Sequence, residues 1–121
     1  MNTNNEAFDQ LNNQSVFTGA LIIASSINLF IIQMYKDILK NKEKSKYTRK
    51  QIYSLAILAS NIFLIVTIYF LIEAYETYTS NNNTPNYNYY MAAVLSFIAQ
   101  SIRINTLYKY PETILQTQDI L

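Results

Sequence analysis

Three long stretches with almost no charge alternate with polar segments along the chain. Their apolar parts cover 16–35, 52–72 and 89–108, and each is close to the roughly 20 residues that a helix needs to cross a bilayer. Residues 62–72 are apolar on every side of a helix, whereas a surface helix of a soluble protein has a polar outer face. The pattern therefore predicts an all-α integral membrane protein with three transmembrane helices in one domain. A soluble three-helix bundle is the alternative.

The three stretches differ in strength. Each large apolar residue of 52–72 favours insertion by about 0.3–0.6 kcal/mol, which outweighs the polar Asn61. The third stretch contains Arg103, and an arginine at the centre of a span opposes insertion by about 2.5–3.5 kcal/mol. Because Arg103 lies near the end of its stretch, its stem can reach the interface. We expect the third helix to insert with help from the other two.

The basic residues predict an orientation. Most of them lie in 36–50, and none lies in 1–15 or 73–88. Short cytoplasmic loops are rich in Lys and Arg, so we expect the N-terminus outside, a basic cytoplasmic loop at 36–50 and a cytoplasmic C-terminal tail at 109–121. The first stretch follows no basic residue and lacks a small-residue cleavage site, so we expect a retained helix and not a signal peptide.

The remaining connections are polar. Segment 73–88 is expected outside, and because it is rich in asparagine and contains Pro85, we expect an irregular connection over its second half, 77–88. Residues 111–121 are open to two interpretations, a short helix on the membrane surface or a frayed tail.

Tyrosines cluster at both expected interfaces, as amphipathic aromatic residues do. We assign to the inner interface Tyr35, Tyr47, Tyr53, Tyr108 and Tyr110, and to the outer one Tyr75, Tyr78, Tyr87, Tyr89 and Tyr90.

Composition excludes several classes of site. The chain has no cysteine, no histidine and one glycine. A disulfide scaffold, a Cys/His zinc site, a Ser-His-Asp triad and a glycine-rich phosphate loop are therefore excluded. We expect no catalytic activity, no cofactor and no nucleic-acid partner. Residues with AT-rich codons, such as Ile, Asn, Lys and Tyr, greatly outnumber Gly, Ala, Arg and Pro, which predicts the cytoplasmic membrane of a low-GC bacterium.

Three amides share one depth within the predicted spans. Counted at 1.5 Å per residue from the tyrosine that ends each span, Asn28, Asn61 and Gln100 lie roughly 10–12 Å into the membrane. We expect them to form one polar layer between the helices, which would fix the register of packing. The alternative is that each amide bonds separately. Small residues near each amide, such as Ala24 and Ser60, favour close helix packing.

The charged residues carry two further hypotheses. Arg103 is the one formal charge within a span, and Asp37, on the same side, is its expected partner; a snorkelling arginine is the alternative. The basic loop is expected to contact anionic lipid head groups, or else to set topology alone. The residues of that contact are Lys40, Lys42, Lys44, Lys46, Arg49 and Lys50.

These features favour a small non-catalytic membrane protein that works through helix–helix contacts. It would be an accessory, assembly or immunity-type factor whose partner is another membrane protein or a second copy of itself. The alternative is a small transporter or channel formed by oligomers, with the amide layer and Arg103 along its path. A weaker third hypothesis is a membrane enzyme with a cation held by Glu73 and Glu76, which are one helical turn apart.

Overall fold

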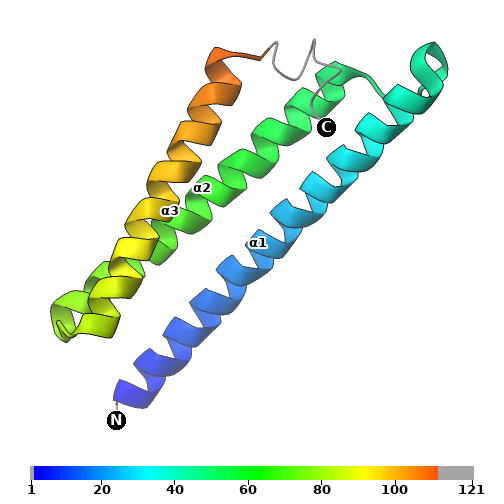
Figure 1. Cartoon of the computed structure of the whole chain (residues 1–121). Coiled ribbons are helices and arrows are strands. Elements are labelled where there is room, and N and C mark those ends of the chain that lie inside the picture. Colours follow the sequence, from blue (N-terminus) through cyan, green and yellow to red (C-terminus); the bar gives the residue numbers. More distant parts are fainter. Residues whose placement is uncertain (1, 112–121) are drawn as a thin grey trace.

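The protein is all-helical, as the sequence predicts. The computed structural model describes residues 2–111, with side chains from residue 4 onward. Three long helices follow one another, α1 (Asn2–Asn41), α2 (Arg49–Ser80) and α3 (Thr84–Lys109), and a short 3₁₀ turn, η1 (Lys42–Lys44), follows α1 (Figure 1).

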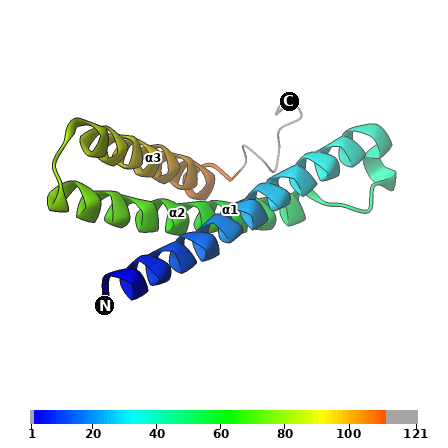
Figure 2. The same cartoon turned by 90° about the horizontal axis from the view of Figure 1, so that it is seen from below.

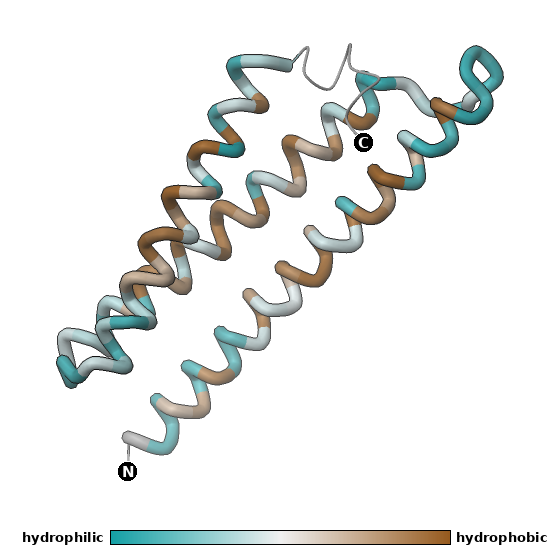
Figure 3. The backbone as a smooth tube through the Cα atoms, viewed as in Figure 1, coloured by the Kyte–Doolittle hydropathy of each residue, from teal (hydrophilic) through white to brown (hydrophobic). Residues whose placement is uncertain are grey.

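Helix α2 is the centre of the arrangement. It contacts α1 and α3, and Figure 2 shows α1 crossing α2 obliquely while α3 runs above α2. The start of α1 and the α2–α3 turn lie at one end of the molecule, and the α1–α2 connection and the end of α3 lie at the other (Figure 1). Polar segments mark both ends and apolar segments fill the middle of each helix (Figure 3).

Two of the described helices, α1 and α2, are long and apolar enough to cross a membrane, and α3 does not reach the same threshold. At 1.5 Å per residue, the 40 residues of α1 and the 32 residues of α2 extend about 60 and 48 Å. Both lengths exceed the hydrocarbon thickness of about 30 Å. The weaker third stretch is the one that carries Arg103.

The polar segment before the first predicted span is helical, which the hydropathy pattern does not predict. Residues 2–18 contain no proline or glycine that would interrupt a helix. Because extending an existing helix by one residue has little further cost, the helix of the span can continue through this segment. The Gln14 side chain also contacts α2 through Glu73. The apolar span is therefore the central part of a longer helix.

The irregular connection expected over 77–88 is instead almost entirely helical. α2 continues to Ser80, and α3 begins at Thr84, which leaves a turn of three residues. Asn83 is the N-cap of α3, with its side chain 2.9 Å from the backbone N–H of Asn86. Pro85 therefore occupies the first turn, where a proline favours a helix start because no backbone N–H is needed there.

The basic segment 36–50 is also more ordered than a loop. Its first residues continue α1, and Lys42 has a positive φ of 51° where the chain leaves that helix. The start of α2 is fixed by a capping box: Thr48 accepts from the N–H of Gln51, and the Gln51 side chain accepts from the N–H of Thr48. These contacts give the connection a defined shape.

The buried residues follow the line along which α2 meets its neighbours. A cluster of Met34, Tyr35 and Ile52 joins α1 to α2 at the basic end. Farther along, Ala24 and Ala59 are fully buried, as expected where small residues let two helix backbones approach closely. The core is a narrow seam, and most of each helix surface is exposed.

Candidate functional site

Charge divides the described part of the molecule into two ends. Beside the start of α1 and the end of α2 lie four acidic residues, Glu6, Asp9, Glu73 and Glu76. All nine basic residues lie at or near the opposite end, from Lys36 to Lys50 and in the last two turns of α3. The fold therefore gathers at its two ends the charges that the sequence predicts on opposite sides of a membrane.

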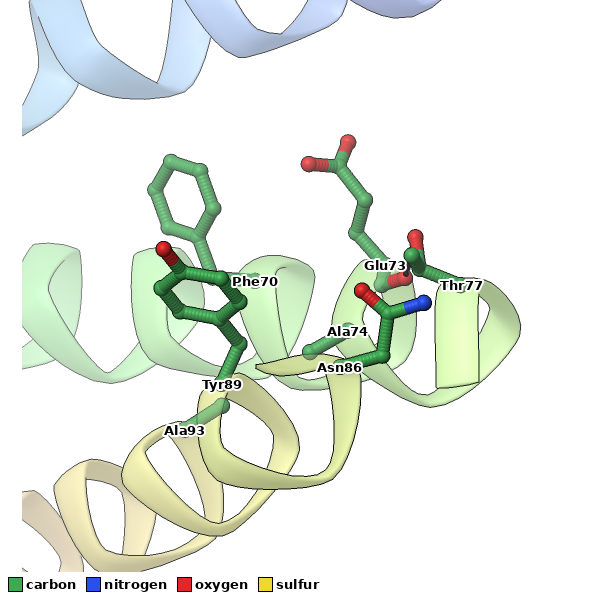
Figure 4. Close-up of a pocket in the computed structure, with 7 residues that line it drawn as sticks. All are labelled: Phe70, Glu73, Ala74, Thr77, Asn86, Tyr89 and Ala93. Carbon is green, nitrogen blue, oxygen red and sulfur yellow. Dashed lines mark hydrogen bonds between the residues drawn. The ribbon is translucent and has the colours of Figure 1, made fainter. Parts of the chain in front are cut away.

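At the acidic end, Glu73 joins α1 to α2. Gln14 donates to one carboxylate oxygen at 2.6 Å, and the Tyr69 hydroxyl donates to the other at 2.6 Å. Phe17 of α1 stacks on the Tyr69 ring, with ring centroids 4.0 Å apart. Figure 4 shows the Glu73 side chain extending from α2 towards α1. Both carboxylate oxygens thus have a partner within the chain.

Two hollows flank Glu73. One of about 300 Å³ lies between α2 and α3 and includes Phe70 and Tyr89 in its lining (Figure 4). The other, of about 860 Å³, lies between the first turns of α1 and the end of α2, and carries the four carboxylates. No group of three or more acidic residues in the described part of the chain is arranged to hold a metal ion. A cation held by Glu73 and Glu76 alone stays a hypothesis, and both Glu73 oxygens already accept hydrogen bonds within the chain.

Tyrosines pack together where α2 turns into α3. Tyr78 lies 5.7 Å from Tyr87 and 5.8 Å from Tyr90 between ring centroids, and Tyr75 lies 5.7 Å from Tyr90. These four rings belong to the predicted outer group. Their contacts hold the two helices side by side just before the turn, a role that interface preference alone does not predict.

The three amides predicted to form one layer have separate surroundings. Gln100 is buried, and its amide donates to the backbone carbonyl of Ser60 at 3.2 Å. Asn61 donates to the Tyr108 hydroxyl at 3.4 Å, and Asn28 lies beside a crevice near the basic end. Within the described residues, no hydrogen bond joins one of these amides to another. The amides of Asn61 and Gln100 each form a hydrogen bond between α2 and α3, and these two bonds are separate from each other.

Arg103 and Asp37 are not brought together as a pair in the described part of the chain. Asp37 accepts hydrogen bonds from Ser45 and from Asn41, the latter at 2.7 Å, and so ties the basic connection to α1. The Ser45 bond, with smaller contributions from Asn41 and nearby lysines, lowers the pKa of the Asp37 carboxyl below its ordinary value. Arg103 lies instead at the crevice that Asn28 also lines.

That crevice, of about 370 Å³, lies where all three helices approach each other. Tyr35 also lines it, and the Tyr35 hydroxyl is buried with no hydrogen-bond partner among the described residues. Sequence reasoning placed Tyr35 at a wet interface, so it missed this feature. The sequence does carry a signal for this feature: Tyr35 lies two helical turns after Asn28, so both side chains lie on one face of α1.

The residues expected to contact anionic lipid lie around the α1–α2 connection. The exposed ones are Lys40, Lys42, Lys44, Lys46 and Lys50, and Arg49 is half-buried. The Lys46 ammonium lies 5.3 Å from the centre of the Tyr47 ring, a cation–π distance. The lysines are accessible, but their arrangement forms no enclosed site in the described residues.

No protein-family model matches this chain, and neither the curated proteins nor the solved structures include a match. The C-terminal segment from residue 112, expected to be a surface helix or a frayed tail, lies outside the described residues.

Proposed function

We propose that the protein resides in the cytoplasmic membrane of a low-GC bacterium with three spans, its N-terminus outside and its C-terminus inside. In this proposal it is a non-catalytic accessory, assembly or immunity-type factor, and it works by contacting another membrane protein or a second copy of itself. The proposal has two parts, residence and contact, which rest on different observations.

Residence is supported by apolar side chains exposed in the middle of each helix. Ile22 of α1 is 63% exposed, Ile65 of α2 is 58% exposed and Leu95 of α3 is 61% exposed. Water would oppose continuous exposed apolar surface along three helices, whereas lipid acyl chains would cover it. The division of charge between the two ends supports the orientation, because all basic residues then face the cytoplasm.

The observation that carries the contact hypothesis is a shallow groove on α1. It is about 330 Å³ in volume and includes Thr18, Ser25 and Ser26 among leucine and isoleucine side chains. Ala24 faces α2 and is fully buried, and the groove residues Ser25 and Ser26 are exposed on other sides of the helix. Small hydroxyl residues allow another helix to approach closely in lipid, although the Ser26 hydroxyl itself donates to the carbonyl of Ile22 in its own helix at 2.9 Å.

Residence and orientation are tested by cysteine accessibility in intact cells. The chain has no cysteine of its own, so single substitutions Asn4→Cys, Glu43→Cys, Asn82→Cys and Gln118→Cys report separately. We expect a membrane-impermeant maleimide to label positions 4 and 82 and to reach 43 and 118 only after permeabilisation. External labelling of position 43 would overturn the orientation, and recovery of the protein in the soluble fraction would overturn residence.

The contact hypothesis is tested by photo-crosslinking in native membranes. A crosslinking residue at Ser25 is expected to yield one discrete protein adduct, and the adduct is expected to weaken when Ser26→Leu fills the groove. The matched control places the same residue at Leu95 of α3, which is 61% exposed and lies outside the groove. Lipid adducts alone at both positions would overturn the hypothesis.

The alternative of an oligomeric transporter or channel has weaker support. It needs polar groups in line across the membrane. The hydroxyls of Thr67, Ser101 and Thr106 each donate to a carbonyl of their own helix, as is ordinary for hydroxyls in apolar helices. We therefore advance the contact hypothesis, and solute flux into liposomes that contain the purified protein would restore the alternative.

A further inference from the structure

The crevice at the basic end combines a cation with a buried polar group. Its polar lining comes from three helices: Asn28 and Tyr35 of α1, Ser60 of α2, and Arg103 and Thr106 of α3. Apolar side chains, among them Ile31 and Leu107, form the rest of its wall. At about 370 Å³ it accommodates a small charged group with part of an attached chain.

Tyr35 is the most informative member of this lining. The side chain is 5% exposed, and its hydroxyl has no hydrogen-bond partner in the described part of the chain. Buried hydroxyls in proteins are almost always hydrogen-bonded, because burial without a partner opposes folding. Tyr53, which lies nearby in the same cluster, follows this rule by donating to the carbonyl of Leu107 at 3.0 Å. The Tyr35 hydroxyl is therefore unpaired and shielded in this structure, and a group in the crevice can accept its hydrogen bond only when the side chains that cover the hydroxyl move aside.

Arg103 gives the charge of the missing group. Its side chain is exposed, its guanidinium carries five N–H donors and no acceptor, and among the described residues it has no ion-pair partner. The hydroxyl of Tyr35 and the amide of Asn28 can both donate as well. Such a set of donors matches a tetrahedral oxyanion, and arginine binds phosphate oxygens through two parallel hydrogen bonds.

We propose that this crevice binds one phosphate group, with Arg103 as its charged anchor and Tyr35 as its buried hydrogen-bond donor. Either a phospholipid head group or a free anion could supply this phosphate. The apolar wall and the position near the basic end suit both sources. The lipid source rests on the proposed membrane topology, in which this end faces the inner leaflet. The site differs from the exposed lysines of the α1–α2 connection, which attract anionic surfaces without enclosing one group.

The test measures lipid-dependent stabilisation of the purified full chain in a neutral detergent. Phosphatidylglycerol is titrated, and the thermal unfolding midpoint and the number of bound lipids by native mass spectrometry are recorded. We expect one tightly retained lipid in the wild type. Arg103→Gln is expected to weaken its binding about tenfold and Tyr35→Phe about fivefold. The matched control, Lys109→Gln, removes the same charge from the same helix and is expected to change affinity less than twofold.

A second readout separates ligand binding from structural damage. Without lipid, Tyr35→Phe is expected to be at least as stable as the wild type, because it removes a buried hydroxyl that has no partner. Only the gain in unfolding midpoint on adding lipid is expected to shrink. A lipid-free loss of stability in Tyr35→Phe, or equal losses of affinity in Arg103→Gln and Lys109→Gln, would overturn the proposal.

Inorganic phosphate distinguishes the two sources. Failure of millimolar phosphate to displace the lipid identifies the head group as the occupant, and full displacement identifies the free anion; either result retains the phosphate site. The cysteine labelling pattern of the wild type is recorded on the same preparations. An altered pattern overturns the topology and with it the lipid source, whereas an intact pattern with no selective effect of Arg103→Gln overturns the crevice alone.

Discussion

The two ends of the contact between α1 and α2 are built from different interactions. At the acidic end, Glu73 receives hydrogen bonds from Gln14 and Tyr69. At the basic end, Met34 and Ile52 pack in an apolar cluster that contains a tyrosine hydroxyl with no partner among the described residues. At one end the charged group of the contact is bonded within the chain, and at the other a buried hydroxyl has no partner among the described residues.

This difference distinguishes polar groups that hold the fold together from polar groups that are left to bind a ligand. Glu73 is charged and yet has both oxygens bonded, so its role is explained by holding two helices together. Arg103 is charged, exposed and part of the crevice lining, so holding helices together does not explain it. Charge alone therefore does not identify a site; the degree to which the fold already satisfies that charge does.

The largest expected effect comes from the apolar cluster. Ile52 has no exposed surface, and Ile52→Ala is expected to lower the free energy of unfolding by about 2–5 kcal/mol, because it removes packing and leaves a cavity. The measurement is unfolding in mixed micelles as the denaturing detergent fraction rises. The control Ile65→Ala, at a residue that is 58% exposed, is expected to change the free energy by less than about 0.5 kcal/mol. Equal effects would show that the cluster does not hold this end together.

A smaller effect is expected at the acidic end. Tyr69→Phe keeps the ring that stacks on Phe17 and removes the donor to Glu73, so the free energy of unfolding is expected to fall by about 1–3 kcal/mol. The matched control is Tyr75→Phe, which removes an exposed tyrosine hydroxyl from the same helix. If both variants unfold alike in the micelle assay, the hydrogen bond from Tyr69 to Glu73 does not contribute to stability.

The smallest effect is expected from the α1–α2 connection as the pH falls. Hydrogen bonding holds the pKa of Asp37 in the folded protein below its ordinary value of 3.8. The ionised form therefore stabilises the fold above that value, and this contribution is lost as the pH falls through the lower folded pKa. We expect the unfolding midpoint of the wild type to drop below pH 3.8 more than that of Asp37→Asn. Identical acid profiles would exclude a role for the Ser45–Asp37 bond.

Hydropathy and charge predict the helices and the division of charge, because both depend on residue order alone. The same information predicts the wrong connection at 77–88, since Pro85 ends one helix or starts the next according to the cap before it. Asn83 supplies that cap. The extension of α1 before its predicted span is supported by Gln14, whose contact is with a residue 59 positions away.

The polar sites show a second limit of sequence reasoning. Counting residues along a span gives depth but not the rotation of each helix about its axis. Asn28, Asn61 and Gln100 are predicted to share a depth, yet their surroundings differ because the helices present them in different directions. The buried hydroxyl of Tyr35 is hidden for the same reason, since only packing decides whether an interfacial tyrosine meets water.

The three-residue turn between α2 and α3 has a consequence for how the protein enters a membrane. A connection of this length holds the two helices antiparallel from the moment both have formed. In the proposed topology they would leave the translocation machinery as a hairpin, so the surplus apolar character of α2 offsets the penalty of Arg103 in α3. The insertion of the weakest span is then governed by a neighbouring helix, and lengthening the turn would uncouple the two.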